Sequence, residues 1–427
     1  WVAARAMALA ASARRGPVHV NVPLHEPLVP AVVEPAPDLA YPHAEPRMPA
    51  GPGARQVEAL AQVLSRARRG LIVSGPHDGG PPFAAAVRGL ANRLGWPVLA
   101  DGCSPLRSAV PEAGLWTYDS LLRAPAFAAS HLPDVVVRFG ATPTSKALGD
   151  LIASPAIERS VLVDPEGAWN DPAQRSTDVV AADEEAFCRA LTEALPSAGG
   201  PRPWLEDWLS AEKRAAAAIG RALATTDELF EGRVFTELAG LLPAGATLYV
   251  GNSMPVRDLD SFFPAGTGVR VLANRGANGI DGLLSSGLGA AAVAAGPVVI
   301  VLGDLSLLHD IGGLAAVQAA GLRATVVLLN NDGGGIFSFL AQARLPEEGF
   351  ERLFGTPHGL DFSIAARLFG LAHARVADWA GFREEVRRSL NGSGASMIEV
   401  RTDRRTNVTQ HQAVWAHVAA TSMEESS

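Results

Sequence analysis

The sequence reads VVIVLGDLS over residues 298–306 and TVVLLNNDGGG over residues 325–335. Each segment starts with a β-branched apolar run of strand length and ends in turn residues. An amphipathic stretch from Leu307 to Ala320 lies between them, so the region predicts a β-α-β unit. Because such crossovers are right-handed, the carboxyl ends of both parallel strands reach the same edge of the sheet. We therefore expect Asp304 and Asn331, 27 residues apart, to converge there.

These two side chains predict a magnesium site. A carboxylate, an amide oxygen and a backbone carbonyl of the Gly-rich turn, for which Gly333 is well placed, make a hard site of low protein charge. Mg²⁺ suits such a site when phosphate oxygens complete its octahedron. A helix expected to open after Ser306 adds free N–H groups for an anion. The predicted ligand is a Mg²⁺-diphosphate, although either half alone is as readily an ordinary turn at the end of a strand.

The composition narrows the class of protein. A chain of 427 residues predicts two or three domains, and 48% hydrophobic residues can fill their cores. The net charge is −8 and no Lys/Arg stripe alternates with aromatic residues, which argues against a nucleic-acid partner. Cys103 and Cys188 are expected to be buried free thiols, as in a reducing cytoplasm.

One segment has the length of a membrane span, because Leu283 to Leu302 contains no charged residue. Glycines and Pro297 divide it, and its last five residues have strand length and β-branched content. We interpret it as a small-residue helix followed by a buried strand. Trp1 to Ala13 lacks the successive regions of a signal peptide, so a soluble protein without a membrane span is expected.

The fold class predicted is α/β, with two doubly wound parallel-sheet domains. Residues 1–30 are expected to be the tail of an earlier domain, ending in a strand within GPVHVNVPLHEPL, and residues 31–55 a Pro-rich linker. A central Rossmann-like domain (56–197) and a second α/β domain with the magnesium motif (204–427) follow. The predicted strands are Leu71–Ser74, Pro97–Ala100, Asp134–Phe139, Val161–Asp164, Val179–Ala181, Thr247–Val250, Val269–Ala273, Val298–Leu302, Thr325–Leu329 and Met397–Val400.

Two further motifs are expected at the same edge of the second sheet. GNSMPVRDLD (251–260) follows a strand and should open a helix, and NRGANGIDG (274–282) follows the next strand. They bring Arg257 and Arg275 to one mouth, which suits a substrate with several carboxylates. The alternative is that Arg257 pairs with Asp258 or Asp260 on a solvated helix face.

Together with GPVHVNVPLHEPL, NRGANGIDGLLSSGLGAA, GDLSLLHDIGGL and LLNNDGGGIFSFL, these motifs resemble the MenD family of 2-succinyl-5-enolpyruvyl-6-hydroxy-3-cyclohexene-1-carboxylate (SEPHCHC) synthases. The resemblance implies a cytoplasmic transferase of menaquinone biosynthesis that joins 2-oxoglutarate to isochorismate with release of carbon dioxide. It also implies thiamine diphosphate with Mg²⁺ (or Mn²⁺) as cofactors and a homodimer or homotetramer. The family has pyrimidine-binding, central and diphosphate-binding domains, and the last two are expected here.

The resemblance also implies site residues, position by position. The metal ligands would be Asp304, Asn331 and the Gly333 carbonyl, and the residues lining the diphosphate would be Gly303, Leu305 and Ser306. Leu305 departs from the glycine usual in the motif. Ile280 would support the bent cofactor. The polar substrate residues would be Asn252, Ser253, Arg257 and Arg275, and the apolar wall Ile336, Phe337 and Leu340. From the spacing of apolar residues alone, the last three would be one face of a helix packed in the hydrophobic core.

One feature of the family has no counterpart in the sequence. The Glu that activates the cofactor belongs to the N-terminal domain, and the first acidic residue here is Glu26. We therefore expect the printed chain to hold no catalytic residue of its own and to be inactive by itself. His309 is expected to be a partly buried helix residue, and the TPHG turn with His358 receives no role.

Two alternative functions stay open. Another thiamine diphosphate-dependent 2-oxoacid decarboxylase or synthase would need fewer fixed cations than Arg257 and Arg275 provide. A non-catalytic nucleotide-binding protein with two Rossmann-like domains is the second, although VSGPHDGGPP lacks the G-x-G-x-x-G fingerprint. Lys146 could reach a carboxylate but is expected to be a solvated surface lysine.

Overall fold

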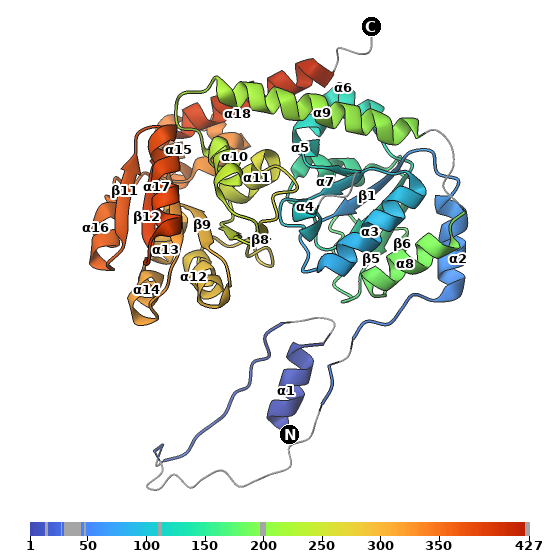
Figure 1. Cartoon of the computed structure of the whole chain (residues 1–427), viewed down its shortest axis with the longest axis horizontal. Helices are drawn as coiled ribbons and strands as arrows, with labels where there is room; N and C mark the ends of the chain where they lie inside the picture. Colours follow the sequence, from blue (N-terminus) through green and yellow to red (C-terminus); the bar gives the residue numbers. More distant parts are fainter. Residues whose placement is uncertain are drawn as a thin grey trace.

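The structure is a computed structural model that describes residues 1–12, 16–26, 28–29, 44–46, 48–109, 113–196 and 202–422. Two six-stranded sheets, each with helices on both faces, lie side by side (Figure 1). Every strand pairing is parallel. The predicted fold class, two doubly wound α/β domains, is therefore confirmed.

The first sheet has the strand order β3-β2-β1-β4-β5-β6. Its strands are β1 Gly70–Ser74, β2 Val98–Ala100, β3 Gly114–Leu115, β4 Val135–Phe139, β5 Arg159–Val163 and β6 Asp178–Val180. The order reverses between β1 and β4, where a crevice forms at the carboxyl ends of the strands. The two-residue strand β3 was not predicted, because it is too short to show a pattern.

The second sheet has the strand order β11-β12-β10-β9-β7-β8. Its strands are β7 Thr247–Val250, β8 Arg270–Leu272, β9 Val298–Gly303, β10 Thr325–Asn330, β11 Ala372–Val376 and β12 Ser396–Arg401. Strand β11, with the sequence AHARV, was not predicted. It lies at the edge of the sheet and only Val376 is buried, so its sequence has no apolar pattern. The central strand β10 is buried throughout and β9 is buried up to Leu302, as continuous apolar runs predict.

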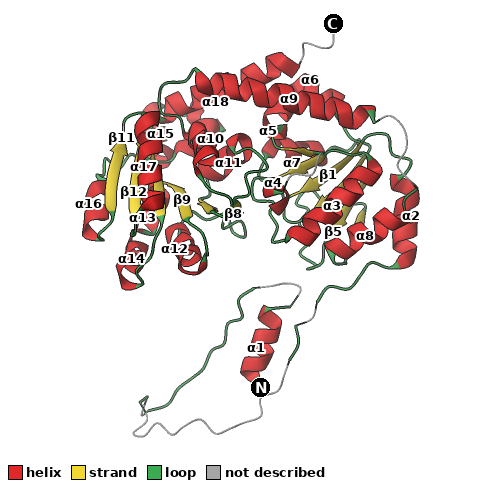
Figure 2. Cartoon of the chain, viewed as in Figure 1, coloured by secondary structure: helices red, strands yellow, loops and turns green. Residues whose placement is uncertain are grey.

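Helices cover both sheets, and the N-terminal segment carries one more helix apart from the sheets (Figure 2). They are α1 Val2–Ala10, α2 Ala54–Leu64, α3 Pro81–Leu94, α4 Pro105–Ser108, α5 Tyr118–Leu122, α6 Pro125–Ser130, α7 Lys146–Ile152, α8 Glu184–Ala194, α9 Pro203–Ala224, α10 Glu231–Leu241, α11 Met254–Phe262, α12 Leu283–Val293, α13 Asp304–His309, α14 Ala315–Ala319, α15 Glu347–Phe350, α16 Phe362–Leu368, α17 Trp379–Asn391 and α18 Arg404–Ser422. Short 3₁₀ and π turns are η1 Ile311–Leu314, η2 Gly335–Phe339, η3 Ala341–Arg344 and η4 Glu351–Gly355.

One hydrophobic cluster joins the two domains. Leu71 and Val136 of the first sheet and Val299 and Val327 of the second belong to it, together with residues of α9 and α18. Helices α9 and α18 pack against one another and lie across both sheets (Figure 1). The outer faces have their own clusters, under α2, α3 and α8 in one domain and under α12 and α16 in the other.

The stretch from Leu283 to Leu302 forms α12 and most of β9, as predicted. Within the described residues, no helix is long and apolar enough to cross a membrane. Cys103 and Cys188 are buried and free, which confirms that prediction too.

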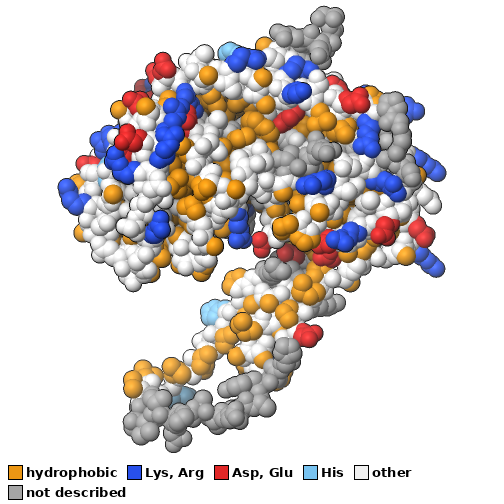
Figure 3. Space-filling view, in the orientation of Figure 1, with side chains coloured by type: hydrophobic (Ala, Val, Ile, Leu, Met, Phe, Trp, Pro, Cys, Tyr) orange, Lys and Arg blue, Asp and Glu red, His pale blue; other side chains and the backbone are white. Residues whose placement is uncertain are grey.

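The N-terminal residues differ from expectation in one respect. Helix α1 forms, but residues 17–25 pair with no other strand in the described chain, so the strand predicted in GPVHVNVPLHEPL is wrong for this structure. A strand needs a neighbour to satisfy its backbone groups. Apolar side chains along the N-terminal residues stay uncovered (Figure 3). Met7 of α1 and Leu24 are among the exposed ones. More than half of the predicted linker (31–55), namely residues 31–43 and 47, lies outside the described residues.

The connection from β9 to β10 was predicted as a single helix, and the structure differs. It is divided into α13, η1 and α14, and α13 begins at Asp304 rather than after Ser306. The break lies at Asp310, whose carboxylate accepts hydrogen bonds from the backbone N–H (2.7 Å) and hydroxyl (2.8 Å) of Ser285. Gly312 and Gly313, which follow shortly after Asp310, weaken the helix further. This local hydrogen bonding was invisible in the periodicity.

Helix α11 is fastened to the central domain through Asp260. Its Oδ1 accepts hydrogen bonds from the Gly102 N–H (2.8 Å) and the Tyr118 hydroxyl (2.6 Å), and its backbone oxygen accepts one from Arg107. Nearby, Ser261 Oγ donates to Asp119 (2.9 Å). These bonds fix the helix whose first turn belongs to the candidate site.

Burial and the neighbouring Asp101 raise the pKa of Asp260 to about 8. In the unfolded chain the pKa is about 3.9, so the folded state binds more protons between these values. This group therefore stabilises the fold at low pH, and its contribution is lost as pH rises towards 8. We expect Asp260→Asn, whose amide oxygen can still accept both bonds, to flatten this slope. Urea unfolding of both proteins between pH 5 and pH 9 measures it, with exposed Asp150→Asn as control; parallel profiles would contradict the prediction.

Candidate cofactor and substrate site

Strands β9 and β10 are neighbours and end level with one another. Leu329 is paired with Gly303, so Asp304 and Asn331 both follow the carboxyl ends of adjacent strands. The backbone N–H of Gly333 donates a hydrogen bond to Asp304 Oδ2 (3.0 Å). The structure thus brings the aspartate and the Gly-rich turn together at the edge where the sequence predicted a metal.

Asp304 is a buried carboxylate without a cationic Lys or Arg partner in the described residues. Its Oδ1 accepts the N–H of Leu305 (2.6 Å), and its side chain lies within α13's first turn. Burial raises the pKa of Asp304, whereas the hydrogen bonds from the two backbone N–H groups and the nearby His358 lower it. A buried negative charge of this kind is stabilised by a bound cation.

The two adjacent asparagines have different roles. Asn330 uses both ends of its amide, because Nδ2 donates to Glu399 (2.8 Å) and Oδ1 accepts the N–H of Asp332 (3.2 Å). Asn331 Nδ2 donates to Glu231 (2.8 Å), but its Oδ1 is buried and has no hydrogen-bond partner in the described part of the chain. An oxygen left free beside a buried carboxylate fits a divalent cation. Among the described residues no three His, Cys, Asp or Glu side chains gather as a metal cluster, so the predicted ligands stay one carboxylate, one amide oxygen and one backbone carbonyl.

Gly333 holds a conformation that no other residue adopts without strain. Its φ is +133°, and a Cβ there would lie 1.9 Å from the carbonyl oxygen of Gly355. The turn that offers the Gly333 carbonyl is therefore packed directly on the end of η4.

We expect Gly333→Ala to destabilise the protein by roughly 1–3 kcal/mol, since both the backbone angle and the contact oppose it. It should also weaken cofactor binding, because the turn must shift. Gly349→Ala is the matched control, since a Cβ there meets nothing within 4 Å. Thermal unfolding compares the two, and equal melting temperatures would contradict the prediction.

His358 is a site residue that the sequence reasoning missed. Its Nδ1 accepts the N–H of Leu360 (3.0 Å), which places the proton of the neutral ring on Nε2. Nε2 lies 3.3 Å from Asp304 Oδ2. Asp332 holds the same turn by accepting the backbone N–H groups of His358 (2.9 Å) and Gly359 (2.8 Å). The TPHG turn thus supports the predicted metal ligand, a contact 54 residues away in sequence that no local motif could show.

The substrate motifs meet beside this edge. Asn252 Nδ2 donates to the backbone oxygens of Asn274 (2.9 Å) and Gly279 (2.6 Å), and its Oδ1 accepts from Arg275 Nη1 (2.8 Å). Asn252 therefore binds the two loops together and orients Arg275. Its own polar atoms are occupied, so a role as a direct substrate contact is less well supported than that of the arginine.

Arg257 lies on the first turn of α11, and its Nη1 donates to the carbonyl of Ser253 (2.5 Å). Ser253 has a φ of +72°, a strained conformation of the kind that gathers at functional sites. Desolvation and the positive charge of Arg275 lower the pKa of Arg257, so the two guanidinium groups interact electrostatically. Two neighbouring cations favour an anionic ligand.

The alternative pairing of Arg257 is not observed. Asp258 is buried and contacts His411 Nε2 (2.7 Å), and Asp260 faces the central domain. In the described chain no carboxylate forms an ion pair with Arg257. Its guanidinium is held by a backbone carbonyl and stays available for a carboxylate.

Comparison with known proteins agrees with this geometry. Residues 54–250 match the middle domain of thiamine pyrophosphate enzymes, and residues 260–400 match the thiamine pyrophosphate enzyme C-terminal TPP binding domain. A protein of Geobacillus thermodenitrificans named 2-succinyl-5-enolpyruvyl-6-hydroxy-3-cyclohexene-1-carboxylate synthase is 48% identical over 98% of this chain and 72% of its own length. The chain belongs to the SEPHCHC synthase family.

Further SEPHCHC synthases show the same match. Those of Chloroflexus aurantiacus and Myxococcus xanthus are 44% and 42% identical over 97% and 98% of this chain, in each case covering 72% of the relative. The family resemblance predicted from the motifs is thereby confirmed. The C-terminal domain is a thiamine diphosphate-binding domain, and its edge carries the residues described above.

The remaining residues that the SEPHCHC synthase resemblance implied lie around the same edge. Ser306 is buried in α13, and Ile280 is half-buried in the loop after β8. Ile336 and Phe337 are half-buried in η2, where the Phe337 ring packs against Phe354, and Leu340 is 46% exposed. The alternative of a helix face in the core is thus wrong for Leu340.

Lys146 and His309 are both exposed in the structure. Lys146 is exposed and pairs with Asp150 (2.6 Å), which confirms a solvated surface lysine. His309 is exposed at the end of α13 rather than partly buried, because the helix stops there at Asp310.

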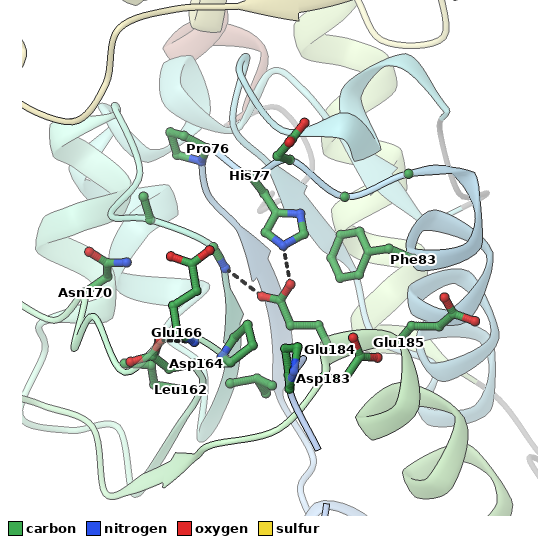
Figure 4. A pocket seen from close by; sticks show the side chains of 18 of the residues that line it. Pro76, His77, Phe83, Leu162, Asp164, Glu166, Asn170, Asp183, Glu184 and Glu185 are labelled. Atoms are coloured by element: carbon green, nitrogen blue, oxygen red, sulfur yellow. Dashed lines mark hydrogen bonds and ion pairs between the residues drawn. The ribbon is translucent and has the colours of Figure 1, made fainter. Parts of the chain in front are cut away.

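A separate cavity of about 530 Å³ opens in the central domain, at the carboxyl ends of β1, β4 and β5 (Figure 4). It is rich in carboxylates, but the buried ones are already used. Glu184 contacts His77 and accepts the Gly140 N–H (3.2 Å), and Asp164 accepts the N–H of Trp169 (2.7 Å). These carboxylates hold the loops of the crevice together and do not by themselves identify a ligand.

Proposed function

We propose that this protein is a SEPHCHC synthase that uses thiamine diphosphate and a divalent cation, Mg²⁺ or Mn²⁺, to join 2-oxoglutarate to isochorismate. The observation that carries the proposal is the free, buried Asn331 Oδ1 beside Asp304 and the Gly333 turn, in a domain matched to thiamine diphosphate-binding domains. Asp304, Asn331 Oδ1 and the Gly333 carbonyl would hold the cation. When bound, thiamine diphosphate supplies the nucleophilic carbon on which a 2-oxoacid loses carbon dioxide.

The residues of this chain bind and orient the reactants. Arg257 and Arg275 would hold the carboxylates of the two acids, and the link from Asn252 to Arg275 fixes one guanidinium in place. Ser306 and the first turn of α13 would face the diphosphate, and Ile280 would support the bent cofactor. Ile336, Phe337 and Leu340 would exclude water from the reacting carbons.

The second candidate, a thiamine diphosphate enzyme acting on a simpler 2-oxoacid, is less well supported. Arg257 and Arg275, which follow the ends of the neighbouring strands β7 and β8, provide two cations at this edge, which a monocarboxylate such as pyruvate does not need. A homodimer or homotetramer and a cytoplasmic location stay predictions.

Two measurements test the proposal. Calorimetry should show binding of thiamine diphosphate with Mg²⁺, and no binding of NAD or FAD, which would indicate a nucleotide-binding protein instead. Carbon dioxide release and adduct formation are then measured with 2-oxoglutarate plus isochorismate and with pyruvate. Because the chain spans 72% of the relatives' length, the assay compares the printed chain with a form extended by their N-terminal residues. Preferred turnover of pyruvate by the extended form would overturn the substrate assignment.

A further inference from the structure

Glu231 lies behind Asn331, on the side away from the predicted cation. It is the first residue of α10 and its side chain is almost completely buried. Its Oε1 accepts two hydrogen bonds, from Asn331 Nδ2 (2.8 Å) and from the hydroxyl of Thr402 (2.8 Å). Three segments far apart in sequence, the start of α10 and the ends of β10 and β12, therefore meet at one oxygen.

The contact determines which way the Asn331 amide faces. An amide carries donors at one end and an acceptor at the other, so fixing Nδ2 on a carboxylate turns Oδ1 to the opposite side. Gly335 leaves room for the amide in this position, because a Cβ there would lie 2.6 Å from Asn331 Nδ2. A flipped amide would turn Oδ1 towards the Glu231 carboxylate, which is repulsive, and its N–H groups towards the cation.

We propose that Glu231, held by Thr402, is a positioning residue that keeps the side-chain oxygen of Asn331 directed at the divalent cation. The inference rests on the proposed function, because it assigns Asn331 to the cation. Side chains that orient metal ligands in this way commonly affect metal affinity tenfold or more.

The placement of Glu231 is poorly explained by stability alone. No Lys, Arg or His forms an ion pair with it in the described part of the chain. Burying a carboxylate without such a partner is unfavourable. The comparison with Asn330 supports a specific role. Glu399 holds that amide too, but it also binds Arg375 and Arg401, and Asn330 keeps no free oxygen.

The test uses Mn²⁺ with thiamine diphosphate, followed by electron paramagnetic resonance of the bound Mn²⁺ and by calorimetry. Glu231→Leu removes the acceptor, and we expect Mn²⁺ affinity to fall by about 10- to 100-fold. Glu231→Gln keeps an oxygen acceptor for Asn331 Nδ2 and should retain most of the affinity. A merely structural role would not give this rescue in metal binding. Melting temperatures confirm that the variants are folded.

Glu212→Leu is the matched control. Glu212, in α9, is a carboxylate that accepts the backbone N–H groups of Trp116 and Thr117 (both 3.1 Å), away from the cation. Its loss should lower the melting temperature and leave Mn²⁺ affinity unchanged. Should Glu231→Leu unfold, Thr402→Val, which removes only the supporting hydroxyl, should still weaken Mn²⁺ binding severalfold.

The outcomes separate this inference from the proposed function. Wild-type Mn²⁺ affinity in folded Glu231→Leu or Thr402→Val overturns the positioning role of Glu231. Glu231→Gln that binds Mn²⁺ as weakly as Glu231→Leu also overturns it, because the charge and not the hydrogen-bond acceptor would then matter. In either case, weak Mn²⁺ binding by Asp304→Ala would still support the proposed cation site. A wild-type protein that binds no Mn²⁺ with thiamine diphosphate overturns both.

Discussion

Asp304→Ala is expected to weaken cofactor binding more than any other single substitution in this chain. The change removes the one carboxylate in the predicted set of cation ligands. It also removes the acceptor for the Gly333 N–H and the neighbour of His358 Nε2, so the turn and the imidazole both lose a partner. A lost charge-assisted contact of this kind is worth about 2–4 kcal/mol.

The measurement is calorimetric titration of thiamine diphosphate at saturating Mg²⁺. Asp310→Ala is the matched control, because Asp310 lies at the other end of α13 and its carboxylate accepts hydrogen bonds only from Ser285 among the described residues. It should lower stability and leave cofactor affinity nearly unchanged. Unaltered Mg²⁺-dependent affinity in Asp304→Ala would show that the cation binds elsewhere.

The sequence could predict the edge of the second sheet because the information there is local. A buried apolar strand followed by Gly-Asp, and another followed by Asn-Asn, are each contiguous, and the right-handed crossover brings their ends together. The same reasoning found α11 and the strand before it. The ten strands predicted for the two sheets all have counterparts there, whereas the strand predicted in GPVHVNVPLHEPL has none, and the short strand β3 and the edge strand β11 had no apolar pattern to reveal them.

The supporting side chains could not be predicted, because they are distant in sequence. Glu231 lies 100 residues before Asn331, and Thr402 lies 71 residues after it. His358 reaches Asp304 from a turn whose motif has no chemistry of its own. Likewise, the surface pairing considered for Arg257 failed because Asp258 is buried against His411, from α18, which only the tertiary fold brings near.

Arg257→Ala and Arg275→Ala are expected to impair substrate use while leaving the cofactor site intact. Neither arginine contacts Asp304 or Asn331, and their nearest polar partners are the Ser253 carbonyl and Asn252 Oδ1. Each guanidinium lost from a carboxylate should lower kcat/KM by roughly tenfold or more in the extended form of the protein. Thiamine diphosphate affinity should stay near the wild-type value.

Asn252→Ala distinguishes holding a carboxylate from holding an arginine. It removes the acceptor for Arg275 Nη1 and the donor to the carbonyls of Asn274 and Gly279, yet leaves both positive charges in place. Its effect on kcat/KM should therefore be smaller than that of Arg275→Ala, and combining the two changes should be less than additive because both act on one guanidinium. Arg270→Ala, on an exposed side chain of the neighbouring strand β8, serves as the control. Equal loss of substrate use and cofactor binding in the arginine variants would show instead that these residues stabilise the loops around the site.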